Sequence, residues 1–249
     1  IGHEVVEAEA INSIVLLAAL VSAIFWNLLT WYLGFPSSSS HALIGGFIGS
    51  VVMGAGTGAI QMAGVAKILI ALFTSPIIGF VAGYLLLKLI LRLSWKASPR
   101  INSLFRRGQL VTAIALALSH GANDAQKTMG IITLALLTGG YLSEFVVPTW
   151  VIFICALMIA LGTSVGGWRL IHTIGKKFYR IRPIDGFTTQ ITSAFVILGA
   201  SLVGGPVSTT QVVSSAMMGV GAGEHANRVR WGVAQEIAVA WLLTIPLTA

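Results

Sequence analysis

Charged residues are scarce in this chain of 249 residues, and cysteine is almost absent. Lysine, arginine, aspartate and glutamate together make up 9% of the sequence, whereas 56% is hydrophobic and the mean hydropathy is +0.90. This composition excludes an ordinary soluble domain and is typical of a chain that crosses a membrane several times. Because Cys155 is the one cysteine, the chain can form neither an internal disulfide nor a cysteine metal site.

Signatures of several other protein classes are also missing. The sequence contains no zinc-type ligand spacing, no Gly-x-Ser-x-Gly turn and no cleavable signal peptide, so we expect the first apolar span to serve for targeting. The chain opens on Ile1 rather than methionine, and we expect its natural N-terminus to lie elsewhere. The net charge of +7 does not indicate a nucleic-acid partner, because the basic residues gather in short segments between apolar spans, as orientation signals do.

Two stretches rich in hydroxyl groups interrupt the apolar sequence. The first runs from Gly34 to His41 and the second from Gly205 to Gln211, and they correspond at a constant offset of 170 residues. The matching positions are Pro36 and Pro206, Ser38 and Ser208, Ser39 and Thr209, Ser40 and Thr210, His41 and Gln211, and Gly49 and Gly219. One unbroken offset of this kind indicates an internal duplication.

Each stretch has the composition of a helix start. Proline suits the first turn of a helix, and serine or threonine caps that turn. A helix N-terminus offers free N–H groups and the positive end of the helix dipole, which together favour an anion. The alternative is that the small residues simply let two membrane helices pack closely.

The apolar pattern predicts an all-α, polytopic membrane protein with inverted repeats, re-entrant helical hairpins and a broken transmembrane helix. We assign residues 1–107 to the first repeat and residues 108–249 to the second. The segments, in chain order, are the hairpin 11–58, the span 64–92 with a kink or break at Pro76, the broken or tilted span 109–139, the span 148–166, the hairpin 187–222 and the span 231–248. The hydroxyl stretches form the hairpin tips, where irregular backbone is tolerated if it lines a cavity.

Positive residues mark the cytoplasmic side of a membrane protein. They place the basic segments 92–107, 169–182 and 224–230 inside and the loop 140–147 outside. The second hairpin then starts and ends on the cytoplasmic side. The first hairpin ends on the outer side, so the two tips are expected to meet from opposite faces of the membrane. Inverted repeats with discontinuous helices near the membrane midplane are the architecture of secondary transporters.

A polar island from Ser119 to Thr128 lies in the middle of the apolar segment 109–139. An aspartate at this depth is costly and points to function. Asn123 and Asp124 could coordinate a cation, Asp124 could carry a proton, or Asp124 could simply pair with Lys127 on one helix face. Counted back by the offset, the partner of this island falls before residue 1, and residues 77–92 have no counterpart after Ala249. We therefore expect the chain to be a fragment shortened at both ends.

Three further polar residues lie in the apolar segments. We expect His41 and His120 to be hydrogen-bonded structural or gating residues rather than metal ligands. Glu236 lies in the last span. It could bond to a structural partner or take part in ion coupling, and the sequence favours neither role.

Gly121-Ala122-Asn123-Asp124, together with the two proline–hydroxyl tips, resembles the inorganic phosphate transporter family, the low-affinity phosphate permeases of bacterial type. The resemblance covers the whole chain except for an upstream copy of the Gly-Ala-Asn-Asp motif. It implies a multi-pass protein of the plasma (inner) membrane, not an enzyme, that symports inorganic phosphate with protons or sodium ions. It implies no resident cofactor or metal, although phosphate often travels in this family as a neutral metal–phosphate complex.

The resemblance also assigns roles to residues of this chain. It implies that phosphate is surrounded by Ser38, Ser39, Ser40, Ser208, Thr209 and Thr210. Asn123 and Asp124 would serve the coupling cation, and gating or charge-partner roles would fall to Lys127, His41, Gln211 and His120. One departure concerns Lys127, because many relatives, sodium-coupled ones among them, have asparagine there. An ammonium group competes with a sodium ion, so we favour protons and leave sodium open.

Two rival functions are considered. A sulfate permease on the same scaffold is an alternative, because hydroxyls and N–H groups can bind either sulfate or phosphate. An intramembrane serine hydrolase is disfavoured, because Ser40-His41 and Ser119-His120 are neighbours in sequence and do not face each other on a helix. A homodimer is compatible with a transporter of this build, but nothing in the spacing indicates one.

Overall fold

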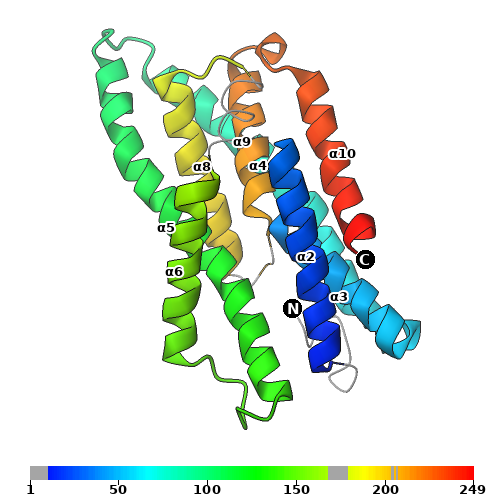
Figure 1. The fold of residues 1–249 in the computed structure, drawn as a ribbon. Coiled ribbons are helices and arrows are strands. Elements are labelled where there is room, and N and C mark those ends of the chain that lie inside the picture. Colours follow the sequence, from blue (N-terminus) through cyan, green and yellow to red (C-terminus); the bar gives the residue numbers. More distant parts are fainter. Residues whose placement is uncertain (1–10, 168–178, 203–204, 206) are drawn as a thin grey trace. The chain divides into compact units, whose positions relative to one another are not determined.

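The computed structural model describes residues 11–167, 179–202, 205 and 207–249, and these residues are almost entirely helical (Figure 1). The elements are α2 (Ser13–Leu33), α3 (Ser39–Ala55), η2 (Thr57–Ala59), α4 (Met62–Leu93), α5 (Ile101–Thr138), α6 (Thr149–Gly166), α8 (Pro183–Leu202), α9 (Thr209–Glu224), η4 (Ala226–Arg228) and α10 (Trp231–Thr248). The predicted all-α class is therefore confirmed. Most of the basic segment 169–182 and Pro206 of the second hairpin lie outside the described residues.

Four helices are long and apolar enough to cross a membrane, judged by length and composition: α2, α4, α6 and α10. The bounds of α4, α6 and α10 agree with the expected spans 64–92, 148–166 and 231–248. α2 was expected to be the first arm of a re-entrant hairpin, and the re-entrant course of that hairpin stays a prediction. The chain is thus a multi-pass membrane protein.

The described helices contain neither the break that was one alternative at Pro76 nor the break expected at the polar island, and the alternative of a kink at Pro76 stays a prediction. α4 runs through Pro76 without interruption. Proline removes one backbone N–H and so frees the carbonyl of Leu72, four residues earlier. The Ser75 hydroxyl donates to that carbonyl at 3.5 Å, which replaces part of the lost bond.

α5 likewise runs for 38 residues through the polar island, and it begins at Ile101, inside the segment 92–107 that was expected to be a basic connection. The prediction of a break there is wrong. The island contains good helix formers such as Ala125 and Gln126. Its hydroxyls also bond within the helix, Ser119 to the carbonyl of Ala115 and Thr128 to that of Asp124. At about 57 Å, the helix exceeds the thickness of a membrane core of about 30 Å, so the tilt considered for this span stays a prediction.

The chain forms two compact units, and neither is continuous in sequence. Unit 1 contains residues 11–70, 124–167 and 238–249 of the described chain, and unit 2 contains residues 71–123 and 179–237. α4, α5 and α10 therefore each contribute to both units. The division into repeats at residue 107 stays a prediction, and so does the inverted orientation of the repeats.

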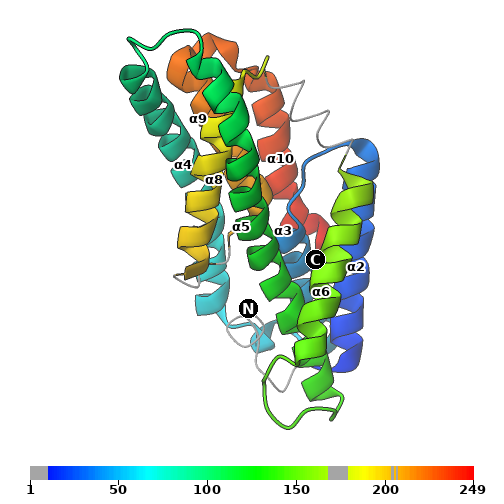
Figure 2. The ribbon, with the colours of Figure 1, turned by 90° about the vertical axis from the view of Figure 1, so that its left-hand side faces the viewer.

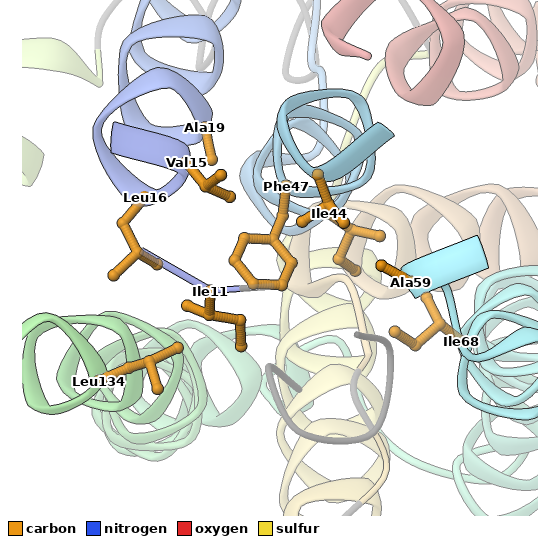
Figure 3. Close-up of a cluster of buried hydrophobic side chains, with 10 residues drawn as sticks. Ile11, Val15, Leu16, Ala19, Ile44, Phe47, Ala59, Ile68 and Leu134 are labelled. Carbon is orange, nitrogen blue, oxygen red and sulfur yellow. The ribbon is translucent and has the colours of Figure 1, made fainter. Parts of the chain in front are cut away.

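The core of unit 1 is an apolar cluster around α2 and α3. Figure 3 shows Ile11, Val15 and Leu16 beside Ile44 and Phe47. Ala59, Ile68 and Leu134 complete its edge. α2 begins at the N-cap Asn12, whose side chain accepts a hydrogen bond from the Val15 N–H at 2.9 Å, and it ends at Gly34 with a φ of 75°.

α2 and α3 pack very closely. A Cβ atom on Gly46 would lie 2.7 Å from the Ala19 carbonyl oxygen, so the two backbones nearly touch there. Figure 2 shows the connection from α2 turning back, so that α3 begins alongside the middle of α2 rather than at its end. The N-terminus of α3 therefore lies beside the middle of a membrane-length helix.

Unit 2 has the same hairpin plan with a smaller apolar cluster. Ile197 on α8 packs with Val207 and Val212 at the start of α9, and Leu116 of α5 lies against them. At Gly219 a Cβ atom would collide with the Phe80 backbone oxygen, so α9 and α4 are in close contact. Charged residues connect the beginning of α8 to the end of α9: Arg182, Asp185, Glu224 and Arg228.

Candidate functional site

The first tip, residues 36–41, leads into α3. Ser38 is the N-cap of α3, and its hydroxyl oxygen accepts a hydrogen bond from the His41 N–H at 3.3 Å. Ser38 and Ser40 are buried, whereas Ser39 is exposed. The sequence-based prediction of a serine-capped helix start is therefore confirmed, and hydroxyls and free N–H groups gather at the positive end of α3.

Neighbouring segments hold this tip in place. The Trp241 indole N–H donates to the Pro36 carbonyl at 3.0 Å, and the hydroxyls of Thr30 and Ser37 are 2.6 Å apart. Neither contact was predicted from the sequence. Trp241 lies 205 residues from Pro36, and no spacing pattern in the sequence signals a contact over that distance.

Lys127 joins the first tip to the polar island of α5. Its ammonium group donates to the Ser40 hydroxyl at 2.7 Å and to the Asp124 carboxylate at 3.2 Å. The Lys127 side chain is 9% exposed and that of Asp124 is 23% exposed. The structure thus contains the Asp124–Lys127 pair, which was one of the three alternatives for Asp124, and it adds a contact to Ser40 that the sequence did not indicate.

The second tip, residues 207–211, leads into α9 in the same way. Ser208 is the N-cap, and its hydroxyl accepts a hydrogen bond from the Gln211 N–H at 3.4 Å. Ser208 and Thr209 are buried, and Thr210 is half-buried. The predicted equivalence of the two tips therefore extends to the capping bond, which joins the first and fourth residues of the same four-residue turn in both.

Asn123 connects the polar island to the second tip. Its amide donates to the Val207 carbonyl at 3.3 Å, and its amide oxygen accepts a bond from the Ser201 hydroxyl at 3.4 Å. Neighbouring island residues thus bond to different tips, Asn123 within unit 2 and Asp124, through Lys127, within unit 1. Ser201 was not among the predicted site residues, and a lone serine near the end of an apolar helix offers no signal by which to find it.

His41 and Gln211 occupy equivalent places, one turn into α3 and α9. Each is 2% exposed. The His41 Nδ1 and Gln211 Oε1 atoms are buried, and neither bonds to another described protein atom. Buried polar atoms of this kind are normally satisfied by water or a ligand. His120 is half-buried on α5, one turn before Asp124, and Glu236 is exposed on α10.

Chemically, the two tips offer hydroxyls, helix N-termini and, at the first tip, an ammonium group. Such groups bind an oxyanion and compensate its charge. Within the part of the chain that the structure describes, no cluster of three or more His, Cys, Asp or Glu side chains could hold a metal ion.

Comparison with known proteins agrees with these features. The model of the phosphate transporter family matches residues 1–99 and 92–249. A probable low-affinity inorganic phosphate transporter of Bacillus subtilis is 48% identical over 96% of this chain and 72% of its own length. Another from Rhizobium meliloti is 44% identical over 100% of this chain and 75% of its own length.

The fold agrees as well. A solved structure described as the sodium-dependent phosphate transporter superposes with a TM-score of 0.85 at 22% identity, covering 98% of this chain and 80% of that one. The matches and the four apolar helices place the protein in the plasma membrane. The sequence-based resemblance is confirmed, and the chain belongs to the phosphate transporter family.

Proposed function

We propose that this protein is a secondary active transporter that carries inorganic phosphate across the plasma membrane together with a cation. The observation that supports it most is the pair of serine-capped helix starts, each bonded to a residue of the polar island of α5. Discontinuous helices whose N-termini point at an anion are typical of secondary transporters.

Phosphate is bound by the hydroxyls and N–H groups of the tips. The residues assigned to it are Ser38, Ser39, Ser40, Ser208, Thr209 and Thr210. A neutral donor set holds the anion by hydrogen bonds without fixing it by several full charges, so that the anion can also be released. The helix dipoles add attraction at both N-termini.

The coupling cation is served by Asn123 and Asp124. The Asp124 carboxylate supplies negative charge within a membrane-length helix, where such a charge is costly unless it is compensated. Binding of the cation offsets the charge of the phosphate, and the hairpins then switch access from one side of the membrane to the other.

Sulfate is the rival anion, and none of the relatives described above is named for it. Sulfate is fully ionised at neutral pH, whereas phosphate keeps at least one proton. The Asp124 carboxylate can accept a hydrogen bond from such a proton and favours phosphate for that reason. We therefore expect excess sulfate to compete weakly with phosphate uptake.

The test is uptake of radiolabelled phosphate into proteoliposomes that contain the full-length protein. Replacing Ser208, Thr209 and Thr210 by alanine is expected to raise the KM for phosphate by at least tenfold, as is replacing Ser38, Ser39 and Ser40. Ser164→Ala on α6 is the matched control, because its hydroxyl is exposed and donates to the Leu161 carbonyl of its own helix. Unchanged phosphate uptake in both triple variants and in Asp124→Asn would contradict the proposal, and efficient sulfate uptake would move the protein to the rival anion.

A further inference from the structure

A groove lies at the C-terminal end of α4 and is formed by residues outside the tips and the polar island. Its volume is about 550 Å³, and its wall combines three basic with three apolar side chains: Lys88, Leu91, Arg92, Leu93, Trp95 and Lys96. The basic residues recur every four positions, so Lys88 and Arg92 lie one turn apart on one face of α4. The groove therefore brings three positive charges together.

No acidic side chain close in the chain neutralises these charges. Residues 10–123 contain neither aspartate nor glutamate, and this range includes all of α4 and the start of α5. Within the described residues, no ion pair involves Lys88, Arg92 or Lys96. The Lys88 ammonium group lies 5.6 Å from the centre of the Tyr84 ring, which holds the group without cancelling its charge. The groove thus matches an anionic ligand.

An exposed apolar stripe lies beside the basic residues. Leu85, Leu89 and Leu93 recur every four positions of α4 and are exposed, as is Trp95. Because α4 is long and apolar enough to cross a membrane, such a stripe lies against lipid chains, and tryptophan is typical of the membrane interface. The end of α4 therefore offers cations to a headgroup and apolar surface to the chains attached to it.

We propose that this groove binds an anionic phospholipid, with the lipid phosphate against the three basic residues and the acyl chains along the leucine stripe. The basic segments predict that this end of α4 is cytoplasmic, and the cytoplasmic leaflet carries anionic lipids. A phospholipid joins a negative phosphodiester to apolar chains, so it matches both walls of the groove. Inorganic phosphate would match the cations alone. An orientation signal would likewise require positive charge, but neither a groove nor an apolar wall.

Binding is measured on the purified full-length protein in detergent, by native mass spectrometry with phosphatidylglycerol and, for comparison, with phosphatidylcholine. Wild type should bind phosphatidylglycerol more tightly than phosphatidylcholine by about tenfold or more, because each basic residue adds to the attraction. The variant Lys88→Gln/Arg92→Gln/Lys96→Gln should lose this preference. The variant Lys88→Arg/Arg92→Lys/Lys96→Arg keeps the charges and should retain the preference.

The matched control removes three charges just outside the groove, through Arg100→Gln/Arg106→Gln/Arg107→Gln, and should bind phosphatidylglycerol as wild type does. Equal losses in the two glutamine variants would overturn the inference, because charge would then act without a site. Equal binding of the two lipids by wild type would also overturn it, as would displacement of phosphatidylglycerol by inorganic phosphate. None of these outcomes depends on transport, so the proposed function is tested separately by the uptake assay.

Discussion

The two hairpins, α2–α3 and α8–α9, share a plan and differ in how each is closed at the end away from its tip. In the first, Gly54 of α3 lies against Val15 of α2, where an added Cβ would be 3.2 Å from a Val15 methyl group. At the offset of 170 residues the equivalent positions in the second hairpin are Asp185 and Glu224. The same place in the fold is thus apolar in one hairpin and ionic in the other.

The ionic closure is a four-residue network. Arg182 bonds to Asp185 at 3.1 Å and to Glu224 at 2.6 Å, and Arg228 pairs with the same two carboxylates. Asp185 is fully buried, and its carboxylate also accepts the Arg182 backbone N–H at 3.0 Å. The positions equivalent to Arg182 and Arg228 in the first hairpin are Asn12 and Gly58, so no part of this network is repeated there.

We infer from this difference that the tips, and not the far ends of the hairpins, are tied to the proposed function. Ser38 and Ser208 keep the same capping bond, although the far ends of their hairpins have diverged completely in chemistry. A tip that must present N–H groups and hydroxyls tolerates few alternatives. The far end has only to hold two helices together, and either close apolar packing or paired charges will do so.

The largest expected effect comes from breaking the ionic closure. Asp185→Ala leaves Arg182 and Arg228 without their shared buried partner, which should cost about 3 to 5 kcal/mol of stability. Thermal unfolding of the purified protein in one detergent measures the loss. Arg92→Ala, at an exposed helix end, is the control. An unfolding temperature unchanged by Asp185→Ala would show that the network does not hold the second hairpin.

A smaller effect is expected from the close packing of the first hairpin. Gly46→Ala would place a Cβ 2.7 Å from the Ala19 carbonyl oxygen and force α2 and α3 apart, at a cost of about 1 to 3 kcal/mol. Gly162→Ala on α6 is the matched control, because an added Cβ there would meet nothing within 4 Å. The same thermal unfolding assay applies, and equal stability of Gly46→Ala and wild type would refute the tight contact.

The smallest effect tests what the hairpins share. Ser38→Ala and Ser208→Ala each remove one capping bond and should each lower stability by about 1 kcal/mol. Replacement of either serine by aspartate, another good N-cap, should restore most of the stability, although its charge should weaken phosphate uptake. Clearly unequal losses in the two alanine variants, measured by unfolding, would show that the two caps are not equivalent.

Local features of the fold could be predicted well from the sequence. The capped starts of α3 and α9 follow from Ser38 and Ser208, and the bounds of α6 and α10 follow from long, mainly apolar runs. These features depend on residues close together in the chain, and a hydroxyl cap or an apolar stretch has the same meaning in most contexts. The offset of 170 residues added a long-range relation, because repetition is visible without knowledge of contacts.

The continuity of α4 and α5 was not predictable in the same way. Pro76 and the polar island both signal a break, yet both helices continue, and at Pro76 the Ser75 hydroxyl partly compensates the carbonyl that the proline frees. Whether a breaker residue interrupts a helix depends on the balance between its local cost and the groups that compensate it.

The hydrogen bonds that connect the site residues were decided by the tertiary structure. Gly-Ala-Asn-Asp and two rows of hydroxyls were recognisable in the sequence, but their connection through Lys127 to Ser40 and through Asn123 to Val207 was not. Those partners are separated by 87 and 84 residues, and several hydroxyls compete for each polar group. A residue type shows which bonds a side chain is able to make, whereas the packing of helices distant in the chain selects the bond that forms.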